Sequence, residues 1–158
     1  LYSEIEKKNS DKVNLIRVFP SYQKFDKVDS DFKCCIIRDP IKRFISAYKN
    51  RILYHKDFYF YNHSIDMILE KLTQNKFENK HFLPQNYFLG NDLKYYSFYA
   101  DFNNIKFFEK KINEFFGKFI EFPKLQTGGK DFEVMLSKKQ INLLQKIYSQ
   151  DFEIYESK

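Results

Sequence analysis

The residues best suited to chemistry lie close together between Arg38 and Ser46, in the segment RDPIKRFIS. Arg38 carries a planar guanidinium whose donors match phosphate oxygens, and Ser46 adds a hydroxyl donor. Asp39 and Pro40 are typical of the first residues of a helix, whose N-terminus offers free N–H groups and a positive dipole end. The segment therefore predicts an anion-binding site. The alternative is that Arg38 pairs with a carboxylate such as Asp39, while Ser46 faces solvent.

A strand and a helix must hold these residues in place. The run from Phe32 to Ile37 is short, apolar and rich in β-formers, which indicates a strand buried on both faces. A helix is expected to follow at once, because apolar residues recur on one face of it: Ile41, Phe44, Ile45, Tyr48 and Ile52. Ligands of open α/β sheets collect at the carboxyl ends of strands, which is where Arg38 is expected.

The longer segment RDPIKRFISAY resembles the 3′-phosphate-binding motif of carbohydrate sulfotransferases, R-[DE]-P-x-x-R-x-x-S-x-Y. Its fixed positions are filled by Arg38, Asp39, Pro40, Arg43, Ser46 and Tyr48. These enzymes use 3′-phosphoadenosine 5′-phosphosulfate (PAPS) as donor and release 3′-phosphoadenosine 5′-phosphate (PAP). The resemblance implies that Arg38 and Ser46 hold the 3′-phosphate, and that Arg43 supports the site or faces the nucleotide.

Residues 79–87, NKHFLPQNY, are similar to the H-[WF]-x-P-Q segment of many of these enzymes. Sulfonate transfer needs a base near the acceptor hydroxyl, and histidine titrates close to neutral pH. His81 is therefore the candidate catalytic base and Gln85 a candidate substrate-binding residue. The alternative is that both residues only fix the loop through hydrogen bonds. Related enzymes often place their base upstream of the RDP motif, where this chain has no histidine.

Two later stretches also resemble the family. Residues 121–132 resemble the loop that covers the nucleotide: Thr127 matches it, and Lys130 follows two glycines whose N–H groups can close on a phosphate. The alternative for this loop is a solvated hinge. The ending YSQDFEIY resembles the pattern Y-x-x-D-[FY]-x-x-[FY], which is expected to be structural, with Phe152 and Tyr155 docking the tail.

Residues 54–63, YHKDFYFYNH, are dense in aromatic side chains. Flat rings stack well on sugars, so this segment, with His55, is a candidate acceptor groove. The alternative is that the aromatic cluster belongs to the core. His55 and His63 lie in no metal-ligand pattern, so we expect no metal site.

The remaining elements are scaffold. Residues 1–9 and 13–19 are expected to form the end of a helix and a short strand. Ser64 starts a helix that runs to about Thr73, and residues 94–101 form another strand. A helix capped by Asn104 ends at Gly117, and a capping box of Ser137 and Gln140 starts a last helix.

The bulk properties fit one domain that binds an anionic partner. The chain has 158 residues, a net charge of +6 and 43% hydrophobic residues. No segment resembles a membrane span or a signal peptide. The only two cysteines, Cys34 and Cys35, are adjacent and expected to be reduced. These features favour a cytoplasmic protein of bacterial type, or one from the Golgi lumen if a membrane anchor precedes this chain.

Members of this family carry a loop rich in Lys, Gly, Ser and Thr that grips the 5′-phosphosulfate, before a helix like the one expected at residues 1–9. This sequence contains no such loop. We expect the loop and its strand to precede Leu1 in the complete protein, because a sheet without them leaves strand edges unprotected. The 158 residues alone are therefore expected to bind the nucleotide weakly and to transfer sulfonate poorly or not at all.

The expected fold is a single α/β domain over residues 1–158, a three-layer P-loop nucleotide-kinase-like fold with a mainly parallel sheet and a truncated N-terminus. The expected function is transfer of a sulfonate from PAPS to a hydroxyl of a carbohydrate acceptor, without a metal. The alternative is a non-catalytic relative that binds a nucleotide or a glycan. Binding of single-stranded nucleic acid is disfavoured, because most phenylalanines fall on helix core stripes.

Overall fold

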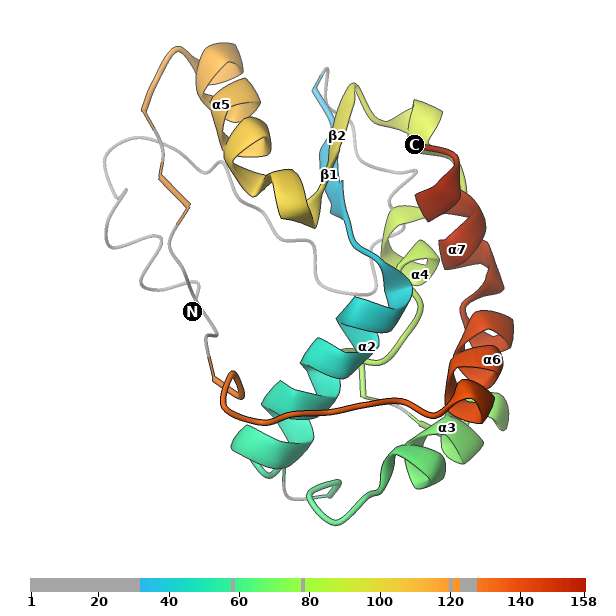
Figure 1. Cartoon of the computed structure of the whole chain (residues 1–158). Helices are drawn as coiled ribbons and strands as arrows, with labels where there is room; N and C mark the ends of the chain where they lie inside the picture. Colours follow the sequence, from blue (N-terminus) through green and yellow to red (C-terminus); the bar gives the residue numbers. More distant parts are fainter. Residues whose placement is uncertain (1–31, 58, 78, 120, 123–127) are drawn as a thin grey trace.

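The computed structural model describes residues 32–57, 59–77, 79–119, 121–122 and 128–158 (Figure 1). The expected helix at residues 1–9 and strand at residues 13–19 lie outside these ranges. In chain order, the described elements are strand β1 (Cys34–Ile37), helix α2 (Pro40–Ala47), π-helix η2 (Tyr48–Tyr54), α3 (Ile65–Thr73), α4 (Asn86–Leu89), 3₁₀-helix η3 (Leu93–Tyr95), strand β2 (Phe98–Asp101), 3₁₀-helix η4 (Phe102–Asn104), α5 (Ile105–Phe116), α6 (Lys138–Ile147) and α7 (Ser149–Glu156).

The two strands pair in parallel, with Cys34 opposite Phe98 and Ile37 opposite Asp101. A parallel pair needs a long crossover, and here α2, η2, α3 and α4 supply it. This arrangement confirms the expected α/β class. The sheet of the described residues has only these two strands, so the three-layer kinase-like arrangement stays a prediction.

Helices cover both faces of this small sheet, α5 on one side and α7 on the other (Figure 1). Cys34 and Ile36 pack with the α5 side chains Phe108 and Ile112. Cys35 and Ile37 pack instead with Ile154 of α7. Successive strand residues point to opposite faces, so this alternation confirms the prediction of a strand covered on both sides.

The largest core cluster lies where α2 and η2 meet α3 and α6. It is formed by apolar residues of these helices: Phe44, Ile52, Ile68, Leu69, Leu72, Leu144 and Tyr148 are all buried. The apolar residues of α5 are only partly buried, because Phe108 and Ile112 are buried whereas Phe115 is 52% exposed. Its ring stacks on Phe32, just before β1, at 3.9 Å between ring centroids.

The predicted helix starts and stops are mostly confirmed. Ser64 and the Ser137–Gln140 box cap α3 and α6, and Gly117 ends α5 in the left-handed conformation. Asn104 makes no side-chain cap, because η4 precedes α5 and Asp101 accepts the N–H of Asn103 instead.

Two element boundaries differ from the prediction. The helix after Asp39 changes into the π-helix η2 at Tyr48, which a regular helical repeat does not anticipate. Residues 93–95 form η3 instead of strand, because the Asp92 carboxylate accepts the N–H of Lys94.

Candidate functional site

The backbone of Arg38, directly after β1, is held by the side chain of Gln85. The Arg38 N–H donates to Gln85 Oε1 at 3.0 Å, and Gln85 Nε2 donates to the Arg38 carbonyl at 2.7 Å. Gln85 therefore fixes the loop through hydrogen bonds, as the alternative interpretation of this residue proposed. Its use in substrate binding stays a prediction.

The loop that carries Gln85 is held by the side chain of Asp151 in α7. Asp151, only 1% exposed, accepts the N–H groups of Gln85 at 2.6 Å and Asn86 at 2.7 Å. Burial raises the pKa of this carboxyl group, while the two N–H bonds and the charge of Arg43 oppose the rise. Arg43 Nη1 also donates to the Leu83 carbonyl at 2.6 Å, so Arg43 supports the site as one of its two expected roles requires.

The guanidinium of Arg38 lies over the ring of Phe102, with 4.6 Å from Cζ to the ring centroid. Among the described residues it forms no ion pair. The carboxylate of Asp39 instead caps the N–H of Lys42. Asp101 binds Tyr155, Lys158 and the N–H of Asn103. The alternative in which Arg38 pairs with Asp39 is therefore wrong, because Asp39 caps Lys42 and forms no ion pair with Arg38.

The pKa values of Arg38 and Asp101 reflect this difference in partners. Burial lowers the pKa of Arg38 and the like charge of Arg43 lowers it further, while the charge of Asp39 opposes this shift without forming an ion pair. Burial also raises the pKa of Asp101, but hydrogen bonds from Lys158, Asn103 and Tyr155 outweigh it and lower this pKa to about 2. A half-buried cation without a carboxylate partner is suited to an external anion.

The N-terminus of α2 contributes less than expected. Pro40 has no N–H, the Asp39 side chain accepts the N–H of Lys42, and the Asp39 carbonyl accepts the N–H of Arg43 at 2.9 Å. The N–H groups of Lys42 and Arg43 are therefore already bonded within the chain, so this helix end offers an anion fewer free N–H groups than expected. Ser46, further along α2, is half-buried, and its hydroxyl has no hydrogen-bond partner in the described part of the chain.

His81 is half-buried near Arg51 and Arg43. Burial lowers the pKa of its ring, and the charges of Arg51 and Lys80 lower it further, against the opposing effect of Asp57. Arg51 Nε pairs with Asp57 Oδ2 at 2.8 Å. The structure therefore brings His81 into the surroundings of Arg43. A neutral ring at pH 7 suits a base, although no described contact joins it directly to Arg38.

The loop at Lys130 packs at the far end of the same helical run. Gly129 has φ +86°, and a Cβ there would lie 2.7 Å from the Lys49 carbonyl oxygen. A rise of 1.5 Å per residue puts Lys49 roughly 15 Å from Asp39. Lys130 is exposed, and Thr127 lies outside the described residues. The two glycines thus have a packing role, and phosphate binding by this loop stays a prediction.

The aromatic segment at residues 54–63 is divided between surface and core. Tyr54, Tyr59 and Tyr61 are 56%, 77% and 50% exposed. Phe60 packs in the core against Phe77, with 4.8 Å between ring centroids. His55 is exposed and contacts Tyr54 edge-on, and no described contact joins it to the site. The core interpretation therefore holds for Phe60, and the acceptor groove stays a prediction.

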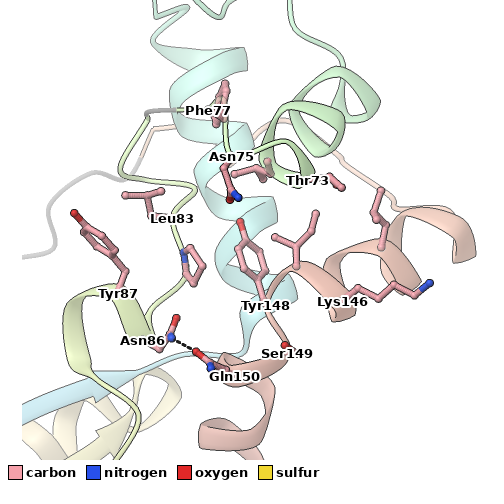
Figure 2. Close-up of a pocket in the computed structure, with 14 residues that line it drawn as sticks. Thr73, Asn75, Phe77, Leu83, Asn86, Tyr87, Lys146, Tyr148, Ser149 and Gln150 are labelled. Carbon is pink, nitrogen blue, oxygen red and sulfur yellow. Dashed lines mark hydrogen bonds between the residues drawn. The ribbon is translucent and has the colours of Figure 1, made fainter.

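A groove of about 930 Å³, missed by the sequence analysis, runs along the loop that holds Arg38 (Figure 2). Its lining includes Asn86 and Tyr87 from α4, Lys146 from α6, and Ser149 and Gln150 from α7. The amide of Asn86 donates to Gln150, as the dashed line in Figure 2 marks. The lining comes from segments far apart in the chain, so no local sequence signal indicated the groove.

The described residues were also considered for metal ligands, membrane-spanning helices and reactive thiols. In the described ranges, no group of three or more His, Cys, Asp or Glu side chains is arranged to hold a metal ion. None of the helices there is long and apolar enough to cross a membrane. Cys34 and Cys35 are free thiols, and burial, followed by the effect of Cys34, raises the pKa of Cys35 to about 12.

Comparisons with known proteins gave one match. A family model described as the sulfotransferase family matches residues 3–157. No curated protein and no solved structure matches the chain. The matched range contains every element that forms the site.

Proposed function

The chain belongs to the sulfotransferase family, and from this premise we propose that it transfers a sulfonate group from PAPS to a hydroxyl group of a carbohydrate. One observation carries the proposal: the half-buried guanidinium of Arg38 has no carboxylate partner among the described residues. A desolvated cation without a partner is costly, and an incoming phosphate removes that cost.

The residues around Arg38 fit the 3′-phosphate of such a donor. Arg38 offers a fork of charged donors, and Ser46 offers a hydroxyl without a described partner. Phe102 supports the plane of the guanidinium from one side. Arg43, bound to the Leu83 carbonyl, adds positive charge without being free to move.

When bound, PAPS supplies a sulfonate group on a 5′-phosphate that can leave. The anchored 3′-phosphate fixes the direction from which the acceptor oxygen must approach. His81 is proposed to take the proton of the acceptor hydroxyl on a ring nitrogen. Its lowered pKa supports this role, because the ring is then neutral and able to accept a proton at pH 7.

A carbohydrate acceptor is supported by the chemistry of the groove in Figure 2. Tyr87 presents a ring that is 58% exposed, and amides of Asn86 and Gln150 lie along the same lining. A flat ring with neighbouring amides matches the apolar face and the hydroxyl edge of a sugar. Lys146 adds a positive charge for an acidic sugar.

Calorimetric titration with PAP tests the donor site, with AMP as the ligand that lacks the 3′-phosphate. We expect Arg38→Ala to weaken PAP binding by about 10- to 100-fold, since a charge-assisted pair to phosphate is lost, and to leave AMP binding unchanged. Lys42→Ala is the matched control, because Lys42 is an exposed cation on the same helix turn. Its effect on PAP should stay below about threefold, the size of a weak surface interaction.

Two results would contradict the proposal. One is a wild-type protein that binds PAP and AMP equally well. The other is an Arg38→Ala variant that keeps wild-type affinity for PAP. Binding of PAP by the full-length protein without any transfer to sugars would favour the non-catalytic relative.

A further inference from the structure

We propose that Asp151 is a positioning residue for the anion site: acting through Gln85, it fixes the backbone of Arg38 so that the guanidinium is ready for the 3′-phosphate. This inference rests on the proposed function, in which Arg38 binds that phosphate. It gives the C-terminal helix α7 a part in nucleotide recognition.

The first step of the argument is the carboxylate itself. Asp151 is 1% exposed, and its two oxygens accept the consecutive N–H groups of Gln85 and Asn86. Among the described residues it has no ion pair within 4.0 Å. A buried carboxylate is expensive, and a carboxylate that binds only backbone donors serves chiefly to fix that backbone.

The second step is the amide of Gln85. Its oxygen and nitrogen both bind the backbone of Arg38, at 3.0 and 2.7 Å. This pair of bonds copies the way in which a neighbouring strand would bind a residue. Gln85 thus extends the order of β1 by one residue past Ile37, and it fixes the direction in which the Arg38 side chain leaves the backbone.

The third step concerns the Arg38 side chain. An arginine side chain has many rotamers, and a mobile arginine loses this conformational freedom when it binds a phosphate. Here the backbone is held by Gln85 and the guanidinium rests on Phe102 at 4.6 Å. The ordering is complete before the anion arrives, which is the general basis of preorganised binding.

The variant Asp151→Asn tests the inference. Asparagine has the same size, but its NH₂ group faces one of the two backbone N–H groups, so one of the two bonds is lost. We expect PAP binding to weaken by about tenfold, while AMP binding changes less than about twofold. The decisive readout is therefore the ratio of PAP to AMP affinity, measured by calorimetry at a temperature where every variant is folded.

Tyr155→Phe is the matched control on the same helix. It removes the 2.7 Å hydrogen bond from Tyr155 to Asp101, one helical turn after Asp151, and leaves the bonds from Gln85 and Asn86 to Asp151 in place. A purely structural effect of loosening α7 should appear in this variant as well. We expect its ratio of PAP to AMP affinity to equal that of the wild type.

Gln85→Leu provides an independent test, also if Asp151→Asn fails to fold. Leucine removes both bonds to Arg38 but leaves the backbone N–H of residue 85 free to bind Asp151. The ratio of PAP to AMP affinity should fall by about tenfold. In the double variant it should fall no further, because both residues act along one path.

The outcomes separate the two claims. If the wild type prefers PAP and Gln85→Leu keeps that preference, the positioning role is wrong and the proposed function stands. If Asp151→Asn folds and keeps the preference, the same conclusion follows. If the wild type itself binds PAP and AMP equally, the proposed function fails.

Discussion

At the scale of single residues, three arginines have different partners: Arg38 lies just before α2, Arg43 in α2 and Arg51 in η2. Arg51 pairs with Asp57 at 2.8 Å, and Arg43 donates to the Leu83 carbonyl at 2.6 Å. Arg38 alone of the three keeps its guanidinium without a hydrogen bond among the described residues, lying only on the ring of Phe102. Residue type is the same in each case, so the partners, and not the guanidinium, distinguish a structural arginine from one that can bind a ligand.

His81 allows a pH prediction at this scale. Its pKa is lowered below the ordinary histidine value of 6.5, first by burial and then by Arg51, so the ring should be neutral at pH 7. We expect its NMR titration midpoint to lie below 6.5. The loss of a signal in His81→Gln assigns the resonance among the three histidines.

Arg51→Met supplies the control for this titration. Removing a nearby positive charge makes protonation easier, so the pKa of His81 should rise in this variant. A wild-type midpoint at or above 6.5 would contradict the lowered pKa that supports the role of base.

At the scale of elements, η2 and the glycine loop depend on each other. Asn50, buried in η2, donates to the Gly128 carbonyl at 3.5 Å. Gly128 lies so close to Tyr54 that a Cβ there would be 2.4 Å from the ring. The change from α2 to η2 therefore coincides with the place where this loop packs against the helix.

Gly129→Ala should destabilise the protein strongly. Its φ of +86° disfavours a side chain, and its Cβ would also contact the Lys49 carbonyl at 2.7 Å. We expect a loss of about 3 kcal/mol in the free energy of unfolding, measured by urea denaturation.

Gly117→Ala is the control for this experiment. Gly117 also has a positive φ, of +60°, but a Cβ there would meet nothing within 4 Å. The substitution Gly117→Ala should lower the free energy of unfolding by only about 1 kcal/mol, the strain of the left-handed conformation by itself. Equal losses in the two variants would show that the contact with Lys49 contributes nothing.

At the scale of the whole molecule, the C-terminal helices join the sheet to the helical core. Tyr148, between α6 and α7, is 1% exposed, and its hydroxyl donates to the Phe82 carbonyl at 2.5 Å. Asp151 binds the same loop, and Tyr155 binds Asp101 at the end of β2. Phe152 and Tyr155 pack against the core clusters as expected, and the buried residues Tyr148, Asp151 and Ile154 hold the ending as well.

Tyr148→Phe should weaken this connection. The variant keeps the ring but leaves the buried Phe82 carbonyl without its donor, so we expect the free energy of unfolding to fall by about 1–2 kcal/mol. Tyr87→Phe, at a residue that is 58% exposed, should change it by less than about 0.5 kcal/mol. Similar values for the two variants would contradict a role for the buried bond.

Features that depend on neighbouring residues in the chain could be predicted without the structure. Asp39, Ser64 and the Ser137–Gln140 box cap their helices because a cap and its partner lie within about four residues. The strand before Arg38 and the family motif were also readable, since both are continuous in the chain. The family match over residues 3–157 agrees with that motif.

Which polar groups are left without a partner depends on contacts between segments far apart in the chain. The hydrogen bonds between the Gln85 side chain and the Arg38 backbone join positions 47 apart, and the bond from Gln85 to Asp151 joins positions 66 apart. The support from Phe102 and the groove at Tyr87 likewise depend on distant segments. A carboxylate can satisfy an arginine or a backbone N–H, and the choice depends on which donor the packed chain brings within about 3 Å of it.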